Sequence, residues 1–101
     1  ARSPTHPGFC DYTSVGRYDC ERGDLGAFAM KPANFRDIHA LKASCTHQCD
    51  QCSRCNFVSF SMEQRDCSWF NSCDLNDLDT SVAHFHTVAV RVRRQPPGAS
   101  R

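Results

Sequence analysis

Four of the eight cysteines lie within the stretch CTHQCDQCSRC, residues 45–55, which also contains a histidine. Cysteine and histidine at such short spacing can hold a zinc ion or an iron–sulfur cluster. They can also supply a reactive thiolate, or the thiols can pair as disulfides in a small oxidised domain. The choice among these chemistries decides whether the stretch is reactive or structural.

An iron–sulfur cluster is the first alternative. CTHQCDQC has the C-x3-C-x2-C spacing that resembles the cluster motif of radical-SAM enzymes, and CDQCSRC fits the C-x2-C-x2-C start of a bacterial ferredoxin motif. A chain of 101 residues is too short for the barrel of the first class. The second class needs a following C-x3-C-P, whereas Cys55 runs into the apolar stretch NFVSF. We therefore expect no cluster.

Zinc is the second alternative, with His47 as a further ligand. A zinc ribbon needs two separated C-x2-C pairs, but Cys67 and Cys73 are six positions apart. Cys10 and Cys20 would also be left without a role. We therefore expect no bound metal and no cofactor.

Catalytic groups do not form a recognisable set. No serine stands in a G-x-S-x-G motif, and the five histidines and eleven acidic residues are scattered along the chain. We predict that the protein is not an enzyme.

A disulfide framework uses all of the thiols. Eight cysteines in 101 residues is an even and unusually high number, which is typical of proteins from oxidising compartments. We expect a secreted protein or one from an organelle lumen, and not a cytosolic one. Because the chain begins with Ala, we expect a processed form, so the lack of a signal peptide does not argue for the cytosol.

The first half of the chain predicts a short strand and a helix. The apolar run LGAFAM, Leu25–Met30, is read as the strand. Pro32 and Asn34 then open the helix, with Asn34 as N-cap and Asp37 in the first turn, where the helix dipole favours an acid. Spacings of three, four and four place four side chains on one buried face: Ile38, Leu41, Cys45 and Cys49.

The second half alternates in the manner of strands. CNFVSFSM, residues 55–62, and CSWF, residues 67–70, form a predicted hairpin around the polar turn EQRD. VAHFHTVAVRV, residues 82–92, is rich in β-branched residues and predicts a long strand. The fold class is therefore α+β: a small disulfide-rich domain with one helix packed on an antiparallel β-sheet.

These cysteines and their surroundings resemble the PAN/apple domain family. The shared features are a helical C-x3-C at Cys45 and Cys49, a cysteine opening the aromatic strand CNFVSFS, and the hairpin cysteine of CSWF. The resemblance implies the disulfides Cys45–Cys67 and Cys49–Cys55, which would fasten the helix to the sheet.

Four cysteines remain, and they allow three pairings. We favour Cys10–Cys20, which would close a local loop, together with Cys52–Cys73, which would tie the helix exit to the loop after the hairpin. The resemblance does not decide among the three pairings.

The match to the family covers roughly residues 24–92, and its specific part lies in residues 41–70. PAN/apple domains bind proteins or carbohydrates in secreted enzymes, adhesins and receptor ectodomains. The resemblance therefore implies a non-enzymatic, extracytoplasmic binding module whose partner is another protein or a glycan. The alternative is a small structural subunit packed permanently into a larger assembly in an oxidising lumen, with both terminal segments as clamps.

The chain divides into three predicted parts: an extended N-terminal arm (1–9), the disulfide-stapled domain (10–92) and a basic flexible tail (93–101). Residues 91–101 contain four arginines and no acid, so the other ninety residues carry a net charge of −3. Such a body does not have the charge pattern of a nucleic-acid-binding domain. No apolar run is long enough to span a membrane.

Arg54, Trp69, His84 and His86 are the candidate contact residues. Trp69 is the single tryptophan, expected either in the core beside a disulfide or exposed as a stacking platform. His84 and His86 alternate with Phe85, so we expect them on one face of the last strand. There they could bind a metal or respond to pH, although a solvated pair is the simpler interpretation.

Overall fold

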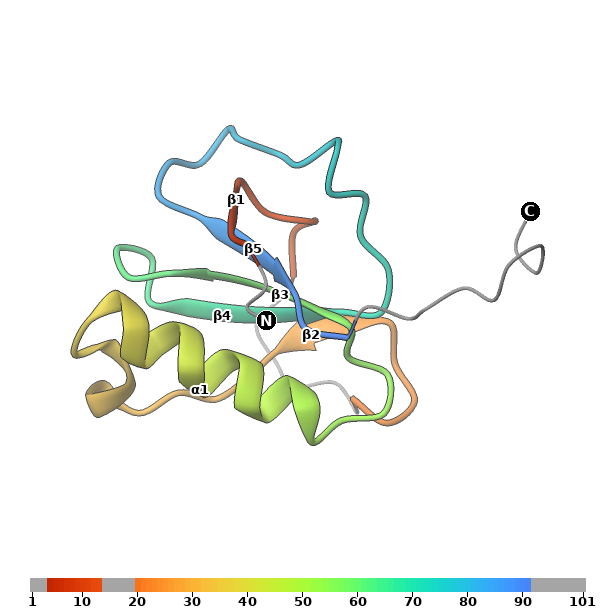
Figure 1. Ribbon diagram of the computed structural model, residues 1–101, viewed down its shortest axis with the longest axis horizontal. Helices are drawn as coiled ribbons and strands as arrows, with labels where there is room; N and C mark the ends of the chain where they lie inside the picture. The colour runs from red at the N-terminus through yellow and green to blue at the C-terminus, as the bar shows by residue number, and fades with distance from the viewer. Residues whose placement is uncertain (1–3, 14–19, 92–101) are drawn as a thin grey trace.

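A computed structural model describes residues 4–13 and 20–91 of the chain. The predicted basic tail, 93–101, lies outside the described residues. Within them, one antiparallel sheet carries an α-helix on one face, while the N-terminal segment and the loop between β4 and β5 lie on the other (Figure 1). The sheet has the order β1-β5-β3-β4-β2, with strands β1 (His6–Pro7), β2 (Leu25–Ala27), β3 (Phe57–Ser61), β4 (Asp66–Phe70) and β5 (His86–Ala89). The predicted α+β class is confirmed.

Helix α1 (Ile38–Asp50) begins one turn later than its sequence predicts. Pro32–Phe35 form a separate 3-10 helix, η1, where Asn34 Oδ1 accepts a hydrogen bond from the backbone N–H of Lys31 at 2.8 Å. The N-cap of α1 is Asp37, whose Oδ1 accepts from the backbone N–H of Ala40 at 2.8 Å. An acidic N-cap satisfies a free helix N–H and complements the helix dipole, so Asp37 starts the helix better than Asn34.

The buried stripe of α1 is as predicted for three of its four residues. Leu41, Cys45 and Cys49 are fully buried, while Ile38 in the first turn remains 36% exposed. This stripe packs on the sheet face formed by alternate residues of β3 and β4, and Val88 of β5 belongs to the same core. In the register of the hairpin, Val58 lies opposite Trp69 and Phe60 lies opposite Cys67.

Strand β2 pairs with β4 at the edge of the sheet, and Gly26 lies opposite Trp69. A Cβ added at Gly26 would lie 2.7 Å from Trp69 Nε1 and 3.0 Å from Trp69 Cε2. The indole therefore occupies the space that any other side chain at position 26 would need. Phe28 stacks on the same indole, with ring centroids 6.3 Å apart.

Strand β5 is much shorter than the predicted strand 82–92. His84 has a φ of 71°, in the left-handed region that a strand does not use, so the chain turns before β5 begins. After β5, the backbone N–H groups of Val90 and Arg91 both donate to the carbonyl of Asn56, at 2.8 and 3.2 Å.

Strand β1 lies within the segment predicted to be an extended arm. His6 pairs with Thr87 and Pro7 with His86 at the edge of the sheet, the position in a sheet where proline is tolerated. Phe9 follows and is only 4% exposed. Its backbone exchanges two hydrogen bonds with Asp79, at 2.9 and 3.0 Å.

The eight cysteines form four disulfides. Cys45 pairs with Cys67 and Cys49 with Cys55, as the family resemblance implies. The first bond joins α1 to β4, and the second joins α1 to the segment that leads into β3. Four disulfides in so short a chain fit an oxidising compartment.

The favoured pairing of the other four cysteines is wrong. The structure pairs Cys10 with Cys73 and Cys20 with Cys52, in place of Cys10–Cys20 and Cys52–Cys73. Cys10 is held beside the sheet because its backbone N–H donates to Ser59 Oγ at 3.1 Å. Cys20 lies at the helix exit, where its carbonyl accepts from the backbone N–H of Arg54 at 3.0 Å. Cys10 and Cys20 are therefore held at different places in the fold, and each pairs with a cysteine that is distant in the sequence.

Candidate functional site

Part of the sheet face that points away from α1 is polar, although Phe57 and Phe70 also lie on this face. Strand alternation places Ser59 of β3, Asp66 and Ser68 of β4 and Thr87 of β5 on this face. Ser59, Ser68 and Thr87 are each at most 3% exposed. Burial of several hydroxyls requires hydrogen-bond partners, which the N-terminal segment supplies.

One hydrogen-bond network fastens the N-terminal segment to this face. Thr87 Oγ1 donates to the carbonyl of Gly8 at 2.8 Å, so Ser59 Oγ donates to Thr87 Oγ1 at 2.7 Å. Ser59 Oγ in turn accepts from the backbone N–H of Cys10. All three hydroxyl and carbonyl groups are thereby engaged, and this network is structural.

A second network ends in a carboxylate. Ser68 Oγ donates to Asp66 Oδ2 at 2.8 Å, and its oxygen accepts from Thr13 Oγ1, 2.9 Å away. Desolvation by burial raises the pKa of Asp66 above its ordinary value, while hydrogen bonds from Ser68 and from the backbone N–H of Cys67 act in the opposite direction. In the part of the chain that the structure describes, no ion pair involves Asp66.

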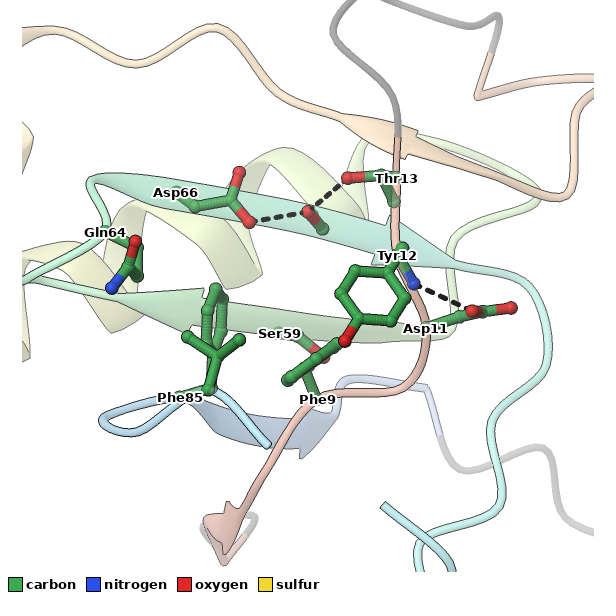
Figure 2. A pocket seen from close by; sticks show the side chains of 10 residues that line it. Phe9, Asp11, Tyr12, Thr13, Ser59, Gln64, Asp66 and Phe85 are labelled. Atoms are coloured by element: carbon green, nitrogen blue, oxygen red, sulfur yellow. Dashed lines mark hydrogen bonds between the residues drawn. The ribbon is translucent and has the colours of Figure 1, made fainter. Parts of the chain in front are cut away.

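Asp66 lines a pocket of about 280 Å³ between the sheet face, the N-terminal segment and the loop before β5 (Figure 2). Three aromatic rings, of Phe9, Tyr12 and Phe85, stand opposite the polar row of Asp66 and Thr13. The centroid of the Phe9 ring lies 5.0 Å from that of Tyr12 and 5.0 Å from that of Phe85. The remaining described lining residues are Asp11, Ser59, Gln64, Ser68 and Val82.

Tyr12 forms the outer wall of this aromatic-acidic pocket. Tyr12 is 63% exposed to solvent. Its hydroxyl makes a 3.1 Å hydrogen bond with Ser81 Oγ, and its backbone N–H donates to Asp11 Oδ1 at 2.8 Å. The hydroxyl contact joins the N-terminal segment to the loop before β5.

A second and more open cavity, of about 600 Å³, lies beside the Cys10–Cys73 disulfide. Asp11 lines both cavities, and the second also contains Asp24 and Asp74. The Asp24 carboxylate is already paired, because Oδ1 lies 2.6 Å from an Arg54 guanidinium nitrogen. The aromatic-acidic pocket is therefore the better candidate site.

Two of the predicted contact residues lie elsewhere. Trp69 is 1% exposed beneath α1, so its role as a contact residue is wrong, and its alternative place in the core is confirmed. Arg54 is partly exposed, but its guanidinium donates to the carbonyl of Gly23 at 3.2 Å as well as pairing with Asp24. It holds the segment before β2 against the helix exit.

The two histidines do not share a strand face as predicted. His84 lies in the turn before β5, with Nδ1 3.9 Å from a Glu63 carboxylate oxygen. His86 lies in β5 with its ring centroid 5.9 Å from that of Phe60. Since strand alternation does not extend back to His84, the inferred common face does not exist.

One group of potential metal ligands occurs among the described residues: Cys20, Glu21 and Cys52. Both sulfur atoms belong to a single disulfide, so neither is available as a thiolate. The group therefore does not support a metal site.

Sequence reasoning missed the pocket because its residues come from four separated segments. A signal was present in the alternation of Ser59, Ser61, Asp66 and Ser68, which indicates a polar sheet face. Which segment covers that face is decided by long-range packing.

Comparisons with protein-family models, with curated proteins and with solved structures return no match. Among the described residues, no helix has the length and apolar character needed to cross a membrane.

Proposed function

We propose that the protein is a non-enzymatic binding module that acts outside the cytosol. The observation that carries this proposal is the aromatic-acidic pocket, a recessed site built on a framework of four disulfides. Rigid scaffolds with recognition groups on loops are typical of binding domains. The resemblance of residues 41–70 to PAN/apple domains supports the same function.

Recognition accounts for the pocket better than catalysis does. Ser59 and Ser68 already donate their hydroxyl protons within the fold. The described lining contains neither a histidine nor a cysteine that could activate a nucleophile. Aromatic rings with a few fixed polar groups are instead the usual composition of a ligand pocket. Arg54, His84 and His86 remain proposed contacts outside it.

The oligomeric state of the native protein distinguishes a binding module from the alternative function, a structural subunit of a larger assembly. On size-exclusion chromatography under non-oxidising, non-reducing conditions, we expect a free monomer. That monomer should bind proteins or glycans saturably on an array. A large complex that survives purification would favour the subunit, and a monomer without affinity for either ligand class would overturn the proposal.

A further inference from the structure

The aromatic-acidic pocket carries an electrostatic imbalance. Of its described lining residues, Asp11 and Asp66 are acidic and none is basic. Neither carboxylate takes part in an ion pair within the described residues. A partly buried carboxylate without a cation costs stability, since desolvation is not repaid by attraction to an opposite charge.

We infer that this pocket receives a cationic side chain, a lysine or an arginine, from a partner protein. The inference rests on the proposed function and names the chemistry that the module recognises. An ammonium or guanidinium group would lie between the Asp66 carboxylate and the faces of the aromatic rings. Aromatic faces attract cations, and the attraction grows as the cation loses water.

The hydrogen-bonding inventory favours a ligand that only donates. Ser59 and Ser68 use their protons inside the fold, so they offer no donor to a ligand, whereas two carboxylates and the Gln64 amide of the described lining supply acceptor oxygens. Lysine and arginine side chains are donors without acceptors, whereas sugar hydroxyls need both kinds of partner. A volume of about 280 Å³ is at the lower end of small-molecule pockets and suits one long side chain.

The aromatic rings are held in place before any ligand arrives. Phe9 is buried and bridged to Asp79, and the Tyr12 hydroxyl is bonded to Ser81. The Cys10–Cys73 disulfide anchors the same segment next to Asp11. Such preorganisation lowers the entropy lost on binding.

The test is a nuclear magnetic resonance titration of the whole protein with matched peptides. Acetyl-Gly-Lys-Gly-amide and its arginine analogue carry the cation, and acetyl-Gly-norleucine-Gly-amide has the same aliphatic chain without it. We expect saturable shifts of the amides of Thr13, Asp66 and Ser68 with the cationic peptides. The norleucine peptide should bind about tenfold more weakly or worse.

Two variants locate the binding energy. Asp66→Asn should weaken the lysine peptide about tenfold, because the amide keeps the shape but loses the charge. Tyr12→Leu keeps both carboxylates and should weaken it about threefold to tenfold through loss of the ring. Asp77→Asn removes an exposed carboxylate that lines neither cavity, so the peptide affinity should stay within about twofold.

Equal affinity for the lysine and norleucine peptides would overturn the inference, as would an unchanged affinity in Asp66→Asn. Shifts of the same amides by galactose or N-acetylglucosamine, with none by the cationic peptides, would also overturn it. In that case the binding module would stand and only its ligand class would change. A native protein locked in a permanent complex would instead count against the proposed function.

Discussion

The Asp66 carboxylate is expected to lower the stability of the fold, and the cationic ligand proposed for the pocket would offset that cost. Its carboxylate sits on a polar sheet face, bonded to Ser68 and lacking a cation among the described residues. Binding sites commonly retain such strained groups because a ligand completes them.

We predict that Asp66→Asn raises the melting temperature at pH 7. Burial raises the pKa of Asp66 above the ordinary 3.8, so the folded state favours the protonated form. The stabilising effect of that proton is complete below pH 3.8 and is lost as the pH rises through the raised pKa. Asparagine can still accept the Ser68 hydrogen bond, as the neutral Asp66 carboxyl can. The gain in melting temperature of Asp66→Asn over the wild type should therefore shrink towards zero at pH 3.

Calorimetry of both proteins between pH 3 and pH 7 provides the measurement. Asp77→Asn is the matched control for loss of one negative charge. A melting temperature of Asp66→Asn that lies below that of the wild type at pH 7, with no difference at pH 3, would contradict the prediction and show that the charged carboxylate stabilises the fold.

Asp37 gives the opposite dependence on pH. The backbone N–H of Ala40 holds the pKa of this N-cap carboxyl below 3.8, with a further contribution from Arg36. The stability that it contributes is present above pH 3.8 and is lost as the pH falls through the lowered pKa. We expect Asp37→Ala to lower the melting temperature at pH 7, while Asp37→Asn retains most of the cap.

Thermal unfolding followed by far-ultraviolet circular dichroism measures this effect. The difference in melting temperature between wild type and Asp37→Asn should narrow as the pH falls from 3.8 through the lowered pKa of Asp37, where the carboxyl group of the folded protein becomes neutral. If the difference in melting temperature between wild type and Asp37→Asn were the same from pH 2 to pH 7, the charge of Asp37 would not be the source of the stabilisation.

At the level of elements, the close approach of edge strands to their neighbours explains two glycines that the hydrophobic pattern of the strands does not explain. Gly26 places β2 against the indole of Trp69, and Gly8 places β1 against the loop at Leu78. Gly8 also has a φ of 109°, which only glycine adopts readily. Both glycines therefore allow edge segments to lie close to their neighbours.

We predict that Gly26→Ala destabilises the fold by about 1–3 kcal/mol, because the new methyl group would overlap the Trp69 indole. Chemical denaturation measures the free energy of unfolding. In a Trp69→Phe background, the ring that meets the methyl group is smaller, so the cost of Gly26→Ala should fall. Equal costs in both backgrounds would assign the effect to the backbone and not to the contact.

At the level of the whole molecule, the disulfides join segments that are far apart in sequence. Cys10–Cys73 closes a loop of 63 residues and Cys20–Cys52 one of 32. In the chain-entropy model a crosslink of the longer kind stabilises by about 4 kcal/mol, against about 2 kcal/mol for a very short loop. The N-terminal segment and the helix exit are thereby tied to the rest of the domain.

A tryptic digest without reduction tests these pairings. Cleavage after Arg and Lys separates the cysteines into fragments 3–17, 18–22, 43–54, 55–65 and 66–91. With the pairing in the structure, all of these fragments stay linked as one species. Detection by mass spectrometry of a separate 3–17/18–22 species would instead establish Cys10–Cys20 and contradict the fold of the N-terminal segment.

Local periodicity by itself predicted the buried face of the helix and the β3–β4 hairpin, but neither strand β1 nor the short extent of β5. The spacing of Leu41, Cys45 and Cys49 predicted the buried helix face, and alternation from Val58 to Phe60 predicted the hairpin. These patterns suffice because each depends on neighbours within a few residues. The number of cysteines likewise indicated a disulfide framework, and a family resemblance supplied two of its bonds.

The tertiary structure alone decided the other two bonds and the candidate site. Cys10 meets Cys73 because the segment before it pairs with β5, and the pocket exists because the segment after it covers Asp66 and Ser68. Neither contact can be recognised from a periodic pattern in the sequence, since each joins residues about fifty or more positions apart. Long-range packing, and not local pattern, positions the groups proposed to bind a ligand.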